Sequence, residues 1–231
     1  MQKVYQIIIS SLMKTKPPLN RRTRKPQGQS LVEVAIAFPV LIMLLTGVVE
    51  FGFILNNYLS LLDATRDAAR YWSNSDPFVW DPDPLVAPYG SDTFYYETAR
   101  DVEKILDPSI NDPDFEGRRI PLDPALDDVI ISVYGADDTG VIDWRESDGG
   151  PYHLLPGPGH PVGNASSVFT KDDVENTRVS DAPNAGILLV EVHYNYHHVL
   201  NLPWMTAWLP NPLHLQAYTI MPIRAGEPVA P

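Results

Sequence analysis

An uncharged apolar run near the N-terminus constrains the fold of this chain more than any other feature of its sequence. From Val34 to Val49 the sequence VAIAFPVLIMLLTGVV carries no charge, and FGFIL continues the apolar character after Glu50. A helix over residues 31–55 would measure about 37 Å at ~1.5 Å per residue, enough to cross a ~30 Å hydrocarbon core. A helix buried in a soluble core is the alternative, but such helices rarely stay apolar all round for this length. The run therefore predicts a membrane span.

The charge of the chain changes sign at this run. The net charge is -12, yet residues 1–28 contain seven basic and no acidic residues, which leaves ten basic and 29 acidic residues, or -19, for the remainder. Positive flanks stay on the cytoplasmic side, so we expect a single-pass protein with its N-terminus in the cytoplasm and its acidic body outside. An acidic body also lacks the basic face that nucleic acid requires, so no nucleic-acid partner is expected.

The basic leader differs from a secretory signal peptide. In a secretory signal the apolar region comes before a small-residue cleavage site. Here the small-residue site, Gly28-Gln29, comes before the apolar run. A cut at this point would remove the leader and keep the hydrophobic helix, which the ordinary signal peptidase does not do.

The helical pattern continues beyond the apolar run. In YLSLLDATRDAARYW the apolar residues Tyr58, Leu59, Leu62, Ala69 and Trp72 fall on one broad face. The segment from residue 73 to 77, SNSDP, then ends the helix. The predicted division is a leader (1–28), a membrane helix (29–55), an extracytoplasmic continuation of that helix (56–76) and an acidic extracytoplasmic domain (77–231).

The acidic body has the sequence pattern of an α+β domain with long Pro-rich loops. A helix is predicted over residues 94–108, and strands over 128–135, 185–200 and 213–223. Antiparallel strands packed on the outer half of the long helix would form a layer of sheet on helix. Residues 136–180 contain few periodic signals and are predicted to form a long excursion.

No motif in the body predicts catalysis or a cofactor. Glu191, His193 and His197 share one face of the predicted strand and could bind a metal, but exposed polar alternation is the favoured explanation. The acidic stretches 81–84 and 136–148 could hold calcium, but neither has EF-hand spacing, so solvated loops are favoured. Phosphate-binding loops, nucleophile elbows and zinc-protease motifs are absent from the sequence, and no cysteine supplies a thiolate. We therefore expect a protein that is not an enzyme.

The N-terminal third resembles a known family. GQSLVEVAIAFPVLIMLLTGVVEFG followed by DATRDAARYW resembles the TadE-like pseudopilins of tight-adherence (Flp-type) pilus systems, which are part of the type IV pilus group. The resemblance covers residues 25–72, is weaker over 186–226 and is absent from 77–180. The matching positions are Gly28, Glu33, Phe38-Pro39, Gly47, Glu50-Phe51-Gly52 and Arg66 to Arg70.

The resemblance implies a pilin-like fold and a processing site. A membrane-embedded prepilin peptidase would cut between Gly28 and Gln29, making Glu33 the fifth residue of the mature chain. The new α-amino group would be a cation at neutral pH, and pairing it with a carboxylate removes much of the cost of placing both in lipid or in a helix bundle. Between subunits this pair would set the axial register of neighbouring helices. The alternative places Glu33 in the headgroup region.

Glu50 carries two alternatives. It lies at the outer membrane interface, close to Asn56, Asn57 and Tyr58, or it pairs with a polar group of another helix; the interface is favoured.

The resemblance also implies a function and a set of partners. It predicts a minor pilin that acts in the assembly of a tight-adherence pilus or a related secretion filament. Its partners would be a prepilin peptidase, other pilin subunits, membrane platform proteins and the lipid bilayer. The alternative is a membrane-anchored surface protein whose exposed domain binds a ligand or the cell wall without entering a filament.

Overall fold

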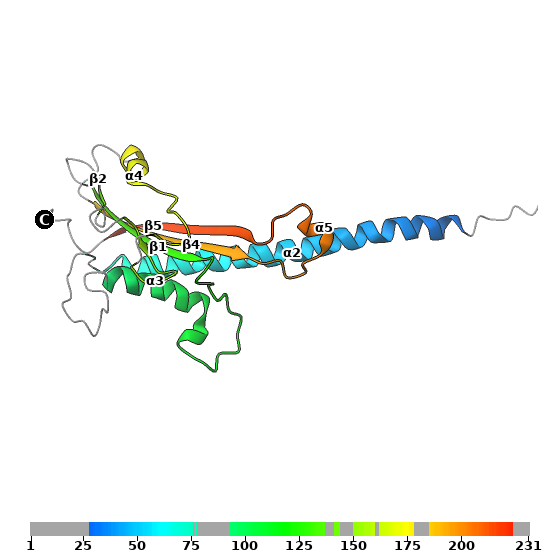
Figure 1. Cartoon of the computed structure of the whole chain (residues 1–231), viewed down its shortest axis with the longest axis horizontal. Helices are drawn as coiled ribbons and strands as arrows, with labels where there is room; N and C mark the ends of the chain where they lie inside the picture. The colour runs from blue at the N-terminus through cyan, green and yellow to red at the C-terminus, as the bar shows by residue number, and fades with distance from the viewer. Residues whose placement is uncertain are drawn as a thin grey trace, which may run out of the picture. The chain divides into compact units, whose positions relative to one another are not determined.

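The computed structural model describes residues 28–75, 77, 93–136, 141–143, 150–159, 162–177 and 185–223 (Figure 1). The chain divides into two compact units, residues 1–45 and 46–231. The leader before Gly28, the acidic stretch 81–84 and much of the stretch 136–148 lie outside the described residues. The calcium and processing predictions that concern those segments stay predictions.

Helix α2 (Gln29–Trp72) confirms the predicted long N-terminal helix. In the first unit, the described side chains from residue 30 to 45 are all exposed, and most of them are apolar. The helix is long and apolar enough to cross a membrane by length and composition. In the second unit its pattern becomes amphipathic, and one face, which includes Leu61, Ala64 and Ala68, is fully buried. Small alanines on this face let the helix backbone come close to the layer beneath it.

The sheet is antiparallel in every pairing that the structure describes, with strand order β2-β1-β4-β5. Its three long strands, β1 (Asp128–Ala136), β4 (Ala185–Tyr196) and β5 (Leu213–Ile223), confirm the predicted strands. Two short strands, β2 (Val141–Asp143) and β3 (Tyr152–His153), pair side by side along the outer edge of β1. The segment 136–180, predicted as an excursion, thus contributes to the sheet, and it also contains helix α4 (Lys171–Thr177).

One face of the sheet packs against the helices to form the main core. Alternate residues of β1 and β4 point to this face, because successive side chains of a strand lie on opposite sides. Helix α3 (Thr93–Leu106), followed by the short turn η2 (Pro108–Ile110), packs on the same core and is joined to α2 where the Trp72 Nε1 donates to Asp101 Oδ2 at 2.8 Å. The sheet residues of this core include Val129, Ile131, Val133, Leu188, Val190 and Val192.

The opposite face of the sheet is covered in part by residues 162–177, which corrects one expectation. Glu191 and His193 were predicted to belong to an exposed polar alternation, but both are buried. Tyr134 and Leu189 form a small second core there with Phe169, and the Tyr134 hydroxyl donates to the Phe169 carbonyl at 3.2 Å. Alternation identifies the side of a sheet on which a residue lies, not whether a later segment covers that side.

Candidate functional site

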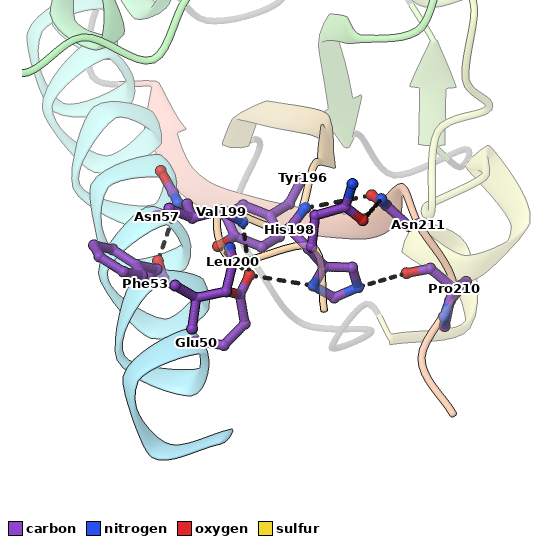
Figure 2. Close-up of polar contacts among 10 residues, drawn as sticks. Glu50, Phe53, Asn57, Tyr196, His198, Val199, Leu200, Pro210 and Asn211 are labelled. Carbon is purple, nitrogen blue, oxygen red and sulfur yellow. Dashed lines mark hydrogen bonds and ion pairs between the residues drawn. The ribbon is translucent and has the colours of Figure 1, made fainter. Parts of the chain in front are cut away.

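Glu50 occupies a fully buried position on α2 in the second unit. Its neighbours Val49 and Phe51 are exposed, whereas no part of Glu50 is accessible. The side chain faces the end of β4 and the β4–β5 loop, which we define as residues 197–212 and which contains helix α5 (Pro203–Thr206) (Figure 2). A carboxylate without accessible surface needs hydrogen-bond donors to offset its desolvation.

Several donors converge on the Glu50 carboxylate. The Tyr196 hydroxyl donates to Oε1 at 2.8 Å, and the backbone N–H of Val199 donates to the same oxygen at 3.0 Å. The backbone N–H of Leu200 donates to Oε2 at 3.0 Å. Figure 2 shows the Glu50 side chain reaching from the helix toward Tyr196, at the end of β4, and toward the loop residues that follow it. We call this group of Glu50, Tyr196, His198, Val199 and Leu200 the Glu50 clamp.

His198 links the carboxylate to the far side of the loop. Its buried ring places Nδ1 3.2 Å from Glu50 Oε1 and Nε2 2.9 Å from the Pro210 carbonyl oxygen. A carbonyl oxygen only accepts, so Nε2 carries a hydrogen. Because the same ring contacts both Glu50 and Pro210, His198 links α2 to the far end of the loop.

Two further hydrogen bonds hold polar groups of the loop. The backbone N–H of His198 donates to Asn211 Oδ1 at 3.3 Å, and Asn211 Nδ2 donates to Asn201 Oδ1 at 3.1 Å.

Burial, reinforced by the bond to Glu50, holds the pKa of the Tyr196 hydroxyl well above its usual range. Tyr196 therefore stays a donor across physiological pH. A carboxylate that accepts hydrogen bonds on both oxygens fastens the loop to the helix.

The structure places the other predicted site residues in the first unit. Gly28 is exposed and directly precedes α2, and its carbonyl accepts from the Val32 N–H at 3.2 Å. Gln29 is the first residue of α2, and the Glu33 side chain is exposed one turn later. None of these three residues belongs to the Glu50 clamp, which lies within the second unit.

Sequence reasoning missed the clamp. It predicted Glu50 at the interface or paired with a polar group of another helix, and it did not predict the partners that the structure shows in the same chain, 146 to 150 residues further on. The available signal was NYHHVLNLPW, in which a tyrosine and a histidine directly follow the strongest strand pattern. Those residue types supply donors that a buried carboxylate needs.

A second buried polar group lies on the covered face of the sheet. Asp128 Oδ2 is 2.7 Å from His153 Nδ1, and the N–H of Leu155 donates to Asp128 Oδ1 at 3.3 Å. Nearby, the N–H of Val168 donates to Glu191 Oε1 at 3.0 Å. These carboxylates therefore hold the His153 ring and residues 165–168 against this face of the sheet.

Two titratable groups of this face have shifted pKa values. Burial raises the pKa of Glu191. Burial, with a further contribution from the neighbouring His214, lowers the pKa of His193 to about 4. Among the described residues, no group of three or more His, Asp and Glu side chains has an arrangement that could hold a metal ion.

The fold and the clamp define a class of protein: an apolar N-terminal helix that continues into an α+β domain and is fastened to it by a buried carboxylate. Residues 28–70 match the family model described as TadE-like protein. The chain is thus TadE-like over almost all of α2, including Glu50. No curated protein and no solved structure matches the chain. The match supports a protein associated with a tight-adherence pilus and, together with the apolar helix, with a membrane.

Proposed function

We propose that this chain is a pseudopilin, or minor pilin, that takes part in assembling a tight-adherence pilus or a related secretion filament and has no catalytic activity. One observation carries the proposal. The TadE-like match begins at Gly28, and α2 begins at the next residue, Gln29. A prepilin peptidase that cuts between these residues would release a mature chain that is helical from its first residue.

The exposed apolar surface of the first unit supports a role in assembly. Its described side chains include Leu31, Ile36, Phe38 and Leu44, each more than half exposed. Water is a poor solvent for such a surface. We propose that lipid covers it in the membrane, with the N-terminus cytoplasmic and the second unit outside, and that neighbouring subunits or platform proteins cover it during assembly. The Glu33 carboxylate then pairs with the α-amino group of Gln29 of an adjacent subunit.

The Glu50 clamp supports a structural role for the second unit. Its donors fasten the β4–β5 loop to α2 close to the end of the apolar run. When force acts on the helix of a subunit, hydrogen bonds as well as packing then transmit it to the sheet.

Peptidase dependence tests the proposal. The chain should be produced with and without a prepilin peptidase, and its length compared by immunoblotting against a C-terminal tag. We expect a shorter form only where the peptidase is present, and we expect Gly28→Val to stay at full length because a branched side chain then occupies the cleavage site.

Gly52→Val is the matched control. A side chain at Gly52, as at Gly28, would meet no atom within 4 Å, so neither substitution creates a clash within the chain. Gly52→Val should be shortened like the wild type. A full-length chain in the presence of active peptidase, or normal shortening of Gly28→Val, would favour the alternative of a membrane-anchored surface protein outside any filament.

A further inference from the structure

The β4–β5 loop exposes large apolar side chains to an unusual degree. Trp208 is 86% exposed, and Val199 and Leu209 are 58% and 41% exposed. Burying side chains of this size is normally favourable, so leaving several of them exposed on one loop requires an explanation. Exposed apolar groups that occur together on a surface mark interaction sites more often than isolated ones do.

The loop also lacks charge within a strongly acidic chain. The sequence carries no Asp, Glu, Lys or Arg from Val192 to Ile223, although the chain as a whole has a net charge of -12. A surface that faces water in such a chain normally carries carboxylates. A surface that enters the edge of a bilayer must avoid them, because charge is costly there.

The position of the loop along α2 determines what it can contact. The loop packs beside α2 around a hollow of about 300 Å³ that is lined by Gly47, Phe51 and Ile54 of the helix and by Trp204, Trp208 and Leu209 of the loop. A Cβ added to Gly47 would lie 3.7 Å from the Trp204 ring, so the glycine lets the loop lie close to the helix. Figure 1 shows α5 lying along α2.

This position coincides with the level at which a membrane helix leaves the hydrocarbon core. A core of ~30 Å is filled by ~20 helical residues, so a span that begins at residue 31 leaves the core near residue 50. Residues 47–54 therefore lie at the outer interface of such a span. Tryptophan is enriched at this level because its ring is apolar while its N–H can still reach water.

We propose that the β4–β5 loop is a second membrane-contacting element, which inserts Trp208 and Leu209 into the outer interface beside α2. Its partner is the lipid bilayer. The proposal rests on the proposed membrane span of α2. The Glu50 clamp holds the loop at this level, since Val199 and Leu200 bond the helix directly.

The absence of cysteine allows a direct test. Single cysteines at Trp208, Val48 and Val162 would each carry an environment-sensitive NBD fluorophore in the full chain, reconstituted in phosphatidylcholine nanodiscs. Lipids with a nitroxide near the headgroup or near the chain end then report depth by quenching. Val48 is an exposed residue of α2, and Val162 is an exposed residue of the segment on the other face of the sheet. Circular dichroism verifies that each variant folds, which is expected because all three side chains are largely exposed.

We expect the fluorophore at Trp208→Cys to be blue-shifted and quenched more strongly by the headgroup nitroxide than by the chain-end nitroxide. Val48→Cys should be quenched, and Val162→Cys should not. Quenching at Val48 without quenching at Trp208 would overturn the loop proposal and leave the membrane span intact, and the loop would then face water or another subunit. A lack of quenching at both positions would overturn the membrane span and the loop proposal together.

Discussion

The Tyr196 hydroxyl donates to the Glu50 carboxylate across 2.8 Å, although 146 residues separate the two in the chain. A second long-range bond, between the Thr65 and Thr219 hydroxyls at 2.9 Å, lies further along the same helix. Fifteen residues of α2 separate the two contacts, or about 22 Å of helix. The sheet is therefore fastened to α2 at two distant points by polar side chains, in addition to the packing between them.

Replacing Glu50 with Gln should destabilise the second unit. The amide nitrogen would face a backbone N–H or the Tyr196 hydroxyl in place of an accepting oxygen, so at least one buried donor loses its acceptor. We expect a loss of about 2–4 kcal/mol in the free energy of unfolding, measured by denaturant titration of the full chain in detergent. Asp67→Asn removes an exposed carboxylate from the same helix and should change little. Equal stability of both variants would contradict a stabilising clamp.

The two threonines form a pair suited to a double-mutant cycle. The Thr65 hydroxyl donates to the Leu62 carbonyl at 2.9 Å, so Thr219 supplies the hydrogen between the two side chains. Thr65→Val should cost roughly 1–3 kcal/mol because it leaves the Thr219 hydroxyl buried without this acceptor. The double valine variant should lose less than the sum of the single variants. Additive losses would show that the two hydroxyls do not interact.

Gly163 lies directly against the buried pair of Asp128 and His153. A Cβ at Gly163 would clash with Asp128 Oδ2 and with His153 Nδ1. Gly163→Ala should therefore force the segment 162–168 away from the sheet and lower the melting temperature. Gly157→Ala, where a Cβ would meet nothing within 4 Å, is the control and should leave the melting temperature almost unchanged. Similar melting temperatures for the two variants would contradict this packing.

His193 should make the second unit sensitive to acid. Its pKa is lowered from 6.5 to about 4, so the unfolded chain takes up a proton that the folded chain excludes. The contribution of the neutral His193 to the free energy of unfolding is fully present above pH 6.5. It is lost as the pH falls to about 4, and the loss amounts to roughly 3 kcal/mol at most. The groups near it are Asp128, which opposes the shift, and His153 and His214, which add to it.

The difference between wild type and His193→Gln isolates this contribution, since the neighbouring carboxylates are present in both proteins. The variant should lose less stability than the wild type over this pH range. His197→Gln, which removes an exposed histidine, should follow the wild-type curve. Parallel curves for wild type and His193→Gln would contradict the assignment.

The regular elements were predictable from sequence because each follows a strong local pattern. The apolar run and its amphipathic continuation predicted α2 up to Trp72, and the runs of β-branched and aromatic residues predicted β1, β4 and β5. The predicted end of β4 was four residues too late. The reason is specific: the N–H groups of Val199 and Leu200, which a longer strand could use for pairing, bond Glu50 instead.

The clamp and the covered face were not predictable because both depend on long-range contacts. β3 is only two residues long and exists through its pairing with β1, so no local period identifies it. Glu191 and His193 alternate as surface residues do, and they are buried because residues 162–170 return over this face of the sheet. For Glu50, the sequence indicated a polar role within an apolar context but not the partners.

The intact mass of the chain purified from the membranes of a host with a tight-adherence pilus tests the central claim most directly. Processing as a pseudopilin predicts a chain that begins at Gln29 and retains the whole of α2. A mass that corresponds to the full 231 residues, or to a chain cut after the apolar run, would contradict the account.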